Sequence, residues 1–262
     1  MINLLRKKKI IILIIFYIFL TFQSHSIEKK NNIMLFIPVS LKESFTEVLD
    51  LYQTIYKIET QAVYLGTAQL AQQIKNGARP DLFVSANIEW IKYLEDRLLV
   101  LNNYRYTLLS NSLVAITNKK NTSADAINSL KDIKNIFLNS GSRISLAMVD
   151  AVPAGIYAKE FLKNIGIWNN IKFNVANSPN VRAALGYISR GDLEYGIVYK
   201  SDALIENKVK IIYEIDPLLH TKVEYPITIL NEKDKTLKLY RFLKTKKALL
   251  IFKKWGFIVN ND

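Results

Sequence analysis

Short apolar runs alternate with amphipathic segments in the first part of the chain. Ser40 is followed three residues later by Glu43, which predicts a capping box at the start of a helix. A second predicted helix starts after Thr67 and stops at Gly77, because glycine commonly ends helices. The apolar runs around these helices predict strands at residues 33–37, 62–65 and 81–86.

The alternation continues in the second part of the chain. Residues 154–164 and 180–190 have the spacing of amphipathic helices, and Gly191 ends the second of them. Two further helices are predicted within residues 235–254. Strands are predicted at residues 113–117, 144–148, 173–175, 195–198, 209–215 and 225–230. Alternating strands and helices favour mostly parallel sheets with helices on both faces, so the sequence predicts an α/β fold.

The N-terminus has the features of a secretory signal peptide. A basic block at residues 6–9 precedes an apolar run at 10–22, and Ser24 and Ser26 place small residues at the positions that signal peptidase reads. The run is shorter than the ~20 apolar residues that a membrane-spanning helix needs. We therefore expect cleavage after Ser26 and a periplasmic protein, with an uncleaved anchor as the alternative.

Composition narrows the classes of partner. The formal charge is +13, or about +9 without residues 1–26, and the lysines are spread along the chain instead of forming one stripe. We interpret this as an ordinary solvated surface, and nucleic acid is not an expected partner. The absence of cysteine excludes disulfides, thiolate metal sites and a lipid-modified cysteine anchor.

Sequence motifs for catalysis are lacking. His220 is the only histidine after residue 26, and its polar surroundings predict a surface position. The chain contains no G-x-S-x-G, G-x-G-x-x-G or Walker A sequence. We therefore predict no enzyme activity, no cofactor and no bare metal ion. The alternative from another class is an exported hydrolase that uses carboxylates, which would need an acid/base pair in a cleft.

Small or hydroxyl residues stand at several predicted strand-to-helix junctions. They are Ser40, Thr67, Ala154, Val181 and, at the end of a strand, Tyr199. In open α/β sheets such junctions converge beyond the carboxyl ends of the strands. First-turn N–H groups lack helical partners and the helix dipole adds partial positive charge, so several junctions together can bind an anion. Each residue also has a structural explanation, since Ser40 and Thr67 can cap helices and Tyr199 can be a packed core tyrosine.

Eight segments, in order, make the chain resemble the periplasmic molybdate-binding proteins of ABC importers. The resemblance extends over essentially the whole chain after residue 26. The segments are 70–78, 81–86 (DLFVSA), 111–114, 152–160 (VPAGIYAKE), 180–185 (NVRAAL), 196–203 (GIVYKSDA), 222–227 and 252–257. The resemblance implies a two-lobed, type II periplasmic-binding-protein fold with a ligand cleft between the lobes. It also implies molybdate or tungstate as the ligand and a membrane permease as the partner.

By position, the family's oxyanion ligands fall on Ser40, Thr67, Ala154, Val181 and Tyr199. The resemblance implies donors only: hydroxyl groups, backbone N–H groups and a phenol. Such a pocket suits a fully deprotonated dianion, because a protonated anion would need an acceptor for its own O–H. The sequence departs from the family pattern in three places. Pro38 removes an N–H beside the site, Thr67 stands where the family usually has serine, and residues 148–151 stand where the family commonly has an Asp-Pro pair.

The resemblance also implies a division into lobes. We expect lobe one to comprise residues 27–110 plus 227–262 and lobe two residues 111–226, with hinges near Ser110–Ser112 and Tyr225–Pro226. A monomer would close around its ligand by a hinge motion. Sulfate or a small organic acid is the alternative ligand, because the sequence does not resolve a modest difference in anion size.

Overall fold

The computed structural model describes residues 32–124, 127, 129–139, 141 and 143–259. The predicted signal peptide, residues 1–26, lies outside the described residues. From Ile33 onward the described chain forms one compact unit. Within the described ranges, no helix has both the length and the apolar character needed to cross a bilayer.

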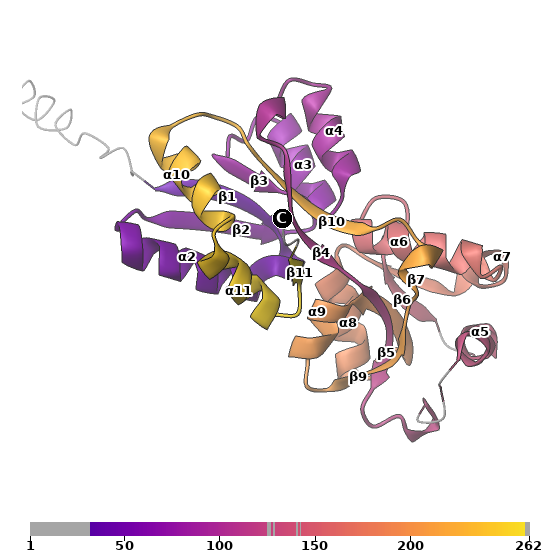
Figure 1. Ribbon diagram of the computed structural model, residues 1–262. Coiled ribbons are helices and arrows are strands. Elements are labelled where there is room, and N and C mark those ends of the chain that lie inside the picture. Colours follow the sequence, from indigo (N-terminus) through magenta and orange to yellow (C-terminus); the bar gives the residue numbers. More distant parts are fainter. Residues whose placement is uncertain (1–31, 125–126, 128, 140, 142, 260–262) are drawn as a thin grey trace, which may run out of the picture. The chain divides into compact units, whose positions relative to one another are not determined.

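Six strands of the described chain form the first sheet (Figure 1), in the order β11-β4-β10-β3-β1-β2. They are β1 (Ile33–Pro38), β2 (Thr60–Leu65), β3 (Leu82–Val84), β4 (Tyr106–Asn111), β10 (Val223–Ile229) and β11 (Ile258–Val259). Strand β1 runs parallel to β2 and β3, whereas β10 runs antiparallel to β3 and β4. Strands β1 and β2 end side by side, where Pro38 pairs with Leu65.

Helices cover both faces of the first sheet. They are α2 (Lys42–Tyr56), α10 (Asp234–Leu243) and α11 (Lys246–Lys254) on one face, and α3 (Thr67–Lys75) and α4 (Ile88–Glu95) on the other. The side chains of β1 alternate between these faces, as the pleat of a strand requires. Leu35 and Ile37 pack with the first group of helices, and Phe36 packs with the second. We call this sheet and its helices the first lobe.

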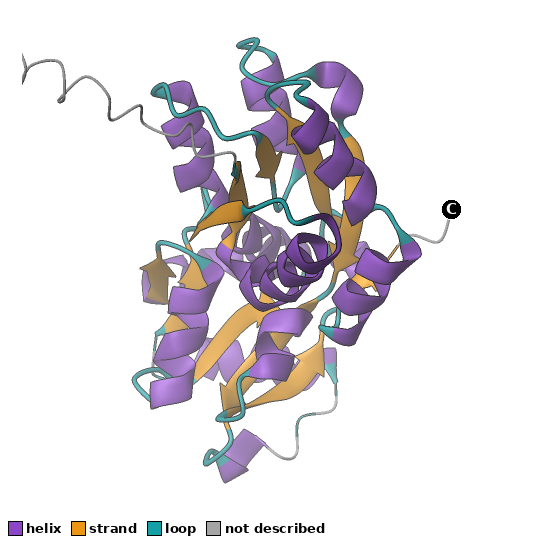
Figure 2. Ribbon diagram, turned by 90° about the vertical axis from the view of Figure 1, so that its left-hand side faces the viewer, coloured by secondary structure: helices purple, strands orange, loops and turns teal. Residues whose placement is uncertain are grey.

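Five further strands form the second sheet, in the order β7-β6-β8-β5-β9. They are β5 (Leu113–Asn118), β6 (Ile144–Ala147), β7 (Val175–Ser178), β8 (Tyr195–Tyr199) and β9 (Val209–Glu214). Its helices are α5 (Leu130–Asn139), α6 (Pro153–Asn164), α7 (Trp168–Ile171), α8 (Val181–Arg190) and α9 (Lys200–Ile205). Helices α6 and α8 pack against β5, β6 and β8, and Figure 2 shows helices flanking the strands. We call this sheet and its helices the second lobe.

The chain passes between the two sheets twice. Ser112 separates β4 from β5, and residues 215–222 lead from β9 back to β10. The prediction of mostly parallel sheets is wrong, because both sheets are mixed. Strands within β–α–β units are parallel, but β10 enters the first sheet against β3, and β5 lies antiparallel to β8 and β9 in the second sheet.

Two local predictions are also wrong. Residues Lys172–Asn174 form a 3-10 turn and the strand begins only at Val175; Phe173 is 85% exposed, so its aromatic ring did not indicate a sheet position. The capping box at Ser40 is absent as well. A 3-10 turn, Val39–Leu41, precedes α2, and α2 has no side-chain cap. The Glu43 carboxylate instead accepts hydrogen bonds from Arg182.

Candidate functional site

One small cavity lies where residues of both lobes meet. Its volume is about 20 Å³, which exceeds the ~10–15 Å³ that one water needs. It is lined by Pro38, Val39, Ser40, Leu65, Gly66, Thr67, Ala86, Val152, Pro153, Ala154, Asn180, Val181 and Tyr199. All five residues predicted for the site are among them, and all five are buried. Among the residues that the structure describes, none with a charged side chain lines the cavity.

The topology explains why these five residues meet. In the first lobe, Ser40 follows the end of β1 and Thr67 follows the end of β2. In the second lobe, Ala154 and Val181 begin the helices that follow β6 and β7, and Tyr199 ends β8. Strands β1 and β2 are parallel to one another, as are β6, β7 and β8, so their carboxyl ends lie at one edge of each sheet. The cavity therefore lies beyond the strand ends, as expected for this class of sheet.

The Thr67 hydroxyl accepts one hydrogen bond within the protein. Its Oγ1 accepts from the backbone N–H of Ala86 at 3.1 Å. This contact leaves the one hydrogen of the Thr67 O–H available to donate into the cavity. Helix α3, which Thr67 begins, is fixed by the Gly66 N–H that donates to Gln69 Oε1 at 3.1 Å. Both contacts hold Thr67 at the cavity with its proton free to donate.

Two helix N-termini face the same cavity. At α8, the Asn180 side chain accepts from the N–H of Ala183 at 2.9 Å, and the Asn180 carbonyl accepts from that of Ala184. The N–H of Val181, the first helical residue, precedes both and has no helical acceptor. At α6, Pro153 occupies the first turn and has no N–H, so the first N–H of this helix is that of Ala154. Both ends also present the positive end of a helix dipole.

Tyr199 contributes a buried phenol. Its hydroxyl is fully enclosed and has no hydrogen-bond partner within the described ranges. The ring packs against Tyr225, with the ring centroids 5.9 Å apart. Burial raises the pKa of Tyr199 well above the ordinary value for a phenol, and the nearby Tyr225, Tyr157 and Asp202 act in the same direction. Tyr199 therefore keeps its proton and can donate it.

Gly155 fixes where the N-terminus of α6 lies. A Cβ at this position would lie 2.2 Å from the carbonyl oxygen of Ala147 and 2.6 Å from that of Met148, both backbone atoms at the end of β6. We expect Gly155→Ala to destabilise the protein by about 1–3 kcal/mol, because the helix must move away from the sheet. Urea unfolding measures the change.

Gly186→Ala is the matched control, because its Cβ would meet only the flexible end of Arg190 at 3.1 Å. Within helix α8 that change should add up to about 1 kcal/mol of stability. Equal stabilities of the two variants would contradict the role given to Gly155.

Sequence reasoning missed several residues at this site. Ala86, Gly66 and Asn180 line the cavity or orient its donors, yet none has a reactive side chain. Their signal was positional: Ala86 ends a predicted strand, Gly66 directly follows one, and Asn180 begins a predicted helix.

His220 was predicted on the surface and is instead buried. Helix α6 covers its segment, because Asn164 donates to the Leu219 carbonyl at 2.9 Å and Glu160 accepts from the Thr221 N–H at 2.7 Å. The ring of Tyr157 lies 6.1 Å from the imidazole. His220 itself is thus enclosed, although its neighbours Thr221 and Lys222 are exposed to solvent.

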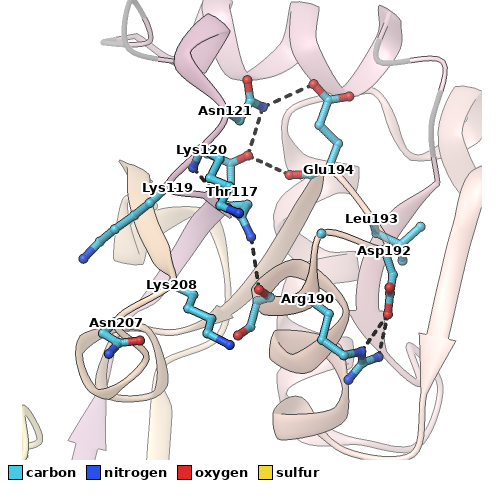
Figure 3. Close-up of a pocket in the computed structure, with 13 residues that line it drawn as sticks. Thr117, Lys119, Lys120, Asn121, Arg190, Asp192, Leu193, Glu194, Asn207 and Lys208 are labelled. Carbon is cyan, nitrogen blue, oxygen red and sulfur yellow. Dashed lines mark hydrogen bonds and ion pairs between the residues drawn. The ribbon is translucent and has the colours of Figure 1, made fainter.

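A second, larger cavity of about 940 Å³ lies at the other end of α8 (Figure 3). Lys119, Lys120 and Lys208 line it, together with two carboxylates that already have partners. Asp192 pairs with Arg190 at 2.7 Å, and Glu194 accepts from Asn121 at 3.2 Å.

This second cavity suits neither anion binding nor hydrolysis by a pair of carboxylates. The carbonyl groups that end α8 carry partial negative charge, which disfavours an anion, and they already accept hydrogen bonds from Asn118. Its carboxylates show no unpartnered acid/base pair. In the described part of the chain, no group of three or more histidine, aspartate and glutamate side chains could hold a metal ion.

Known proteins share both the sequence and the fold. Residues 33–258 match the bacterial extracellular solute-binding protein family. The molybdate-binding protein ModA of Escherichia coli (strain K12) is 32% identical over 237 residues, which are 90% of this chain and 92% of that protein. Among solved structures, the periplasmic molybdate-binding protein of Azotobacter vinelandii superposes with a TM-score of 0.76 at 15% identity and covers 87% of this chain and 100% of that chain. The sulfate-binding protein SubI of Mycobacterium tuberculosis H37Rv gives a TM-score of 0.70 at 11% identity, over 87% of this chain and 86% of that chain.

The structural matches have low identity and therefore bear on the fold alone. They confirm the two-lobed, type II periplasmic-binding-protein fold that the resemblance implied. They do not separate one tetrahedral anion from another. The sequence match covers most of both chains, so it shows the family. The chain belongs to the bacterial extracellular solute-binding protein family, in the group of the ModA molybdate-binding proteins.

Proposed function

We propose that this protein is the periplasmic solute-binding protein of an ABC importer and binds molybdate or tungstate. The observation that carries the proposal is the cavity itself. It is small and buried, no charged side chain lines it, and the side chains and helix N-termini that surround it offer hydrogen-bond donors. Such a site neutralises an anion by directed dipoles, which requires that every hydrogen bond of the anion be met.

In this proposal each lobe supplies some of the hydrogen-bond donors of the five residues. The first lobe supplies the hydroxyl and N–H of Ser40 and the hydroxyl of Thr67. The second lobe supplies the N–H groups of Ala154 and Val181 and the phenol of Tyr199. An anion bound by both sets stabilises the closed arrangement of the lobes, and we propose that the membrane permease recognises this closed form.

The proposed donors also favour particular anions. A fully deprotonated dianion accepts from every donor, whereas hydrogen phosphate brings its own O–H, and one hydroxyl of the lining would have to accept from it instead of donating. The volume of about 20 Å³ disfavours a small organic acid. Sulfate stays the second candidate, because the fold is shared with a sulfate-binding protein.

Further parts of the proposal concern the whole protein. We propose export through a signal peptide cleaved after Ser26, a monomer, no nucleic-acid partner and no enzyme activity. The lobe limits that we propose are residues 27–110 plus 227–262 and residues 111–226. They differ from the first lobe as defined by its sheet only at Asn111 and residues 223–226, where β4 ends and β10 begins. The neutral lining supports binding without chemistry, since no acid or base faces the cavity.

A thermal-shift titration tests the ligand. Molybdate at about 100 times its dissociation constant adds about 2.7 kcal/mol of stability, which raises the melting temperature by several degrees. We expect this shift with micromolar molybdate or tungstate and none with phosphate. A shift with sulfate alone would identify sulfate as the ligand and leave the proposed class of protein, a solute-binding protein, unchanged. No shift with molybdate, tungstate, sulfate or phosphate would overturn the proposal.

The affinity for molybdate should stay constant from pH 7 to pH 9. The dianion is already deprotonated, and the donors of the cavity do not titrate in this range, because burial holds the pKa of Tyr199 well above it. Isothermal titration at pH 7, 8 and 9 measures this. A steady loss of affinity with rising pH would show that a donor of the site loses its proton, against the assignment of Tyr199.

A further inference from the structure

Arg182 joins the two lobes beside the cavity. It follows Val181 in the first turn of α8, and its Nε donates to Oδ1 of Asp202 in α9 of the same lobe. Its Nη1 and Nη2 donate to the two carboxylate oxygens of Glu43 in α2 of the first lobe, at 3.1 and 2.7 Å. This two-pronged contact is the strong, geometrically specific form of an arginine–carboxylate pair.

The carboxylates of Asp202 and Glu43 differ in burial. Separation of the lobes would therefore affect the two carboxylates differently. The Asp202 side chain is fully buried, whereas those of Arg182 and Glu43 are 20% and 33% exposed. Burial raises the pKa of Asp202 and Arg182 opposes this effect, and Asp202 Oδ1 accepts from Arg182 Nε within the second lobe. Glu43 can be hydrated when it is released. The contact between Arg182 and Glu43 is therefore the one that opening would break.

These charged residues are next to residues of the cavity in the chain. Arg182 is adjacent to Val181, Glu43 lies three residues after Ser40, and Asp202 lies three residues after Tyr199. The N-terminal end of α8 also packs against the turn Val39–Leu41 that contains Ser40. The ion pair thus ties together the elements that present three of the five donors.

The other flank of the cavity is joined differently. Trp90 of α4 donates from Nε1 to the carbonyl oxygen of Ala151 at 3.1 Å, and the Tyr157 hydroxyl donates to the Ala86 carbonyl at 3.3 Å. Both contacts link the lobes through neutral groups. The charged contact of Arg182 with Glu43 therefore differs in chemistry from these two links across the cleft.

We propose that Arg182 and Glu43 form a latch that positions the two lobes in the closed state and slows release of the anion. The latch rests on the proposed function, because it acts on the same cavity. Arg182 stays bound to Asp202 throughout, and the pair with Glu43 forms when the cleft closes. Since it forms after the anion has entered, it lengthens the lifetime of the complex and leaves the rate of association unchanged.

Glu43→Gln is the test variant, and Glu47→Gln is its control. Glu43 is the exposed partner, so its replacement leaves no buried charge unpaired. Glu47 lies one turn further along α2 and binds Lys254 and Trp255 of the same lobe at 2.9 and 2.8 Å. Each change removes one carboxylate charge from α2. Of the two carboxylates, only that of Glu43 contacts a residue of the other lobe.

Stopped-flow mixing of each protein with molybdate measures both rate constants. In Glu43→Gln we expect dissociation about tenfold faster, matching the loss of one charge-assisted interaction, and the same association rate. The melting temperature without molybdate should equal that of the wild type. Glu47→Gln should keep both rate constants.

Equal dissociation rates in Glu43→Gln and the wild type would overturn the latch. Equally faster dissociation in Glu43→Gln and Glu47→Gln would also overturn the latch, because it would show a general effect of the charge on α2. The wild-type trace separates the latch from the proposed function. If the wild type does not bind molybdate, the proposed function fails and the latch fails with it. If the wild type binds molybdate and Glu43→Gln releases it at the same rate, the latch alone is overturned.

Discussion

Tyr199→Phe should lower the affinity for molybdate by about ten- to a hundredfold while the protein folds as before. The range follows from the loss of one hydrogen bond to a charged acceptor, which contributes about 1.5–3 kcal/mol. The hydroxyl has no protein partner in the described chain, so its removal leaves no other polar group unsatisfied. Free of anion, the variant should be as stable as the wild type or more stable, because it no longer buries an unpaired hydroxyl.

Isothermal titration and urea unfolding measure these two effects separately. Tyr195→Phe is the control, since Tyr195 lies on the same strand and its hydroxyl accepts from Asn121 at 3.3 Å, far along the strand from the cavity. We expect Tyr195→Phe to keep the affinity. Unchanged binding in Tyr199→Phe would remove this residue from the site.

Val181→Pro should lower the affinity for molybdate at least as strongly as Tyr199→Phe, by about a hundredfold or more. Proline removes the N–H and places its ring where the donor pointed, so the anion loses a hydrogen bond and meets carbon atoms instead. The helix itself tolerates the change, because Val181 is the first residue of α8 and proline is favoured there. Asn180 already has extended backbone angles, φ −161° and ψ 171°, which a following proline requires.

The matched control is Lys246→Pro at the first residue of α11. Lys246 is exposed and also follows a residue whose side chain caps the helix, Thr245. Circular dichroism should show both variants folded, and only Val181→Pro should lose molybdate binding. Retained affinity in Val181→Pro would mean that the N-terminus of α8 does not contact the anion.

Much of the fold could be predicted from local pattern. The helix predicted at 180–190 is an example, because its amphipathic spacing and Gly191 after it are signals that act within a few residues, and the structure has α8 at Val181–Arg190. The strand directions could not be predicted in this way. They depend on how β10 and β5 enter their sheets after the chain crosses between the lobes, which is a long-range property.

In the candidate site, too, some features could be predicted from local sequence and others depend on residues far apart in the chain. The junctions at Ser40, Thr67 and Ala154 are visible as small or hydroxyl residues at predicted helix starts, and Val181 stands in the first turn of a predicted helix. The resemblance to the family selected the same positions. The true partner of Glu43 was hidden, since Arg182 is 139 residues away and the spacing to Ser40 favoured a capping box. The burial of His220 was hidden for the same reason, because helix α6 covers it from a distant part of the sequence.

A crystal structure of residues 27–262 grown with tungstate tests the central claim most directly. The anomalous signal of tungsten locates the anion without reference to the protein. We predict one strong peak in the cavity between the lobes, with oxygen atoms at hydrogen-bond distance from Ser40, Thr67, Ala154, Val181 and Tyr199. A peak at the lysines of the larger cavity, or none at the smaller one, would contradict the assignment of the site.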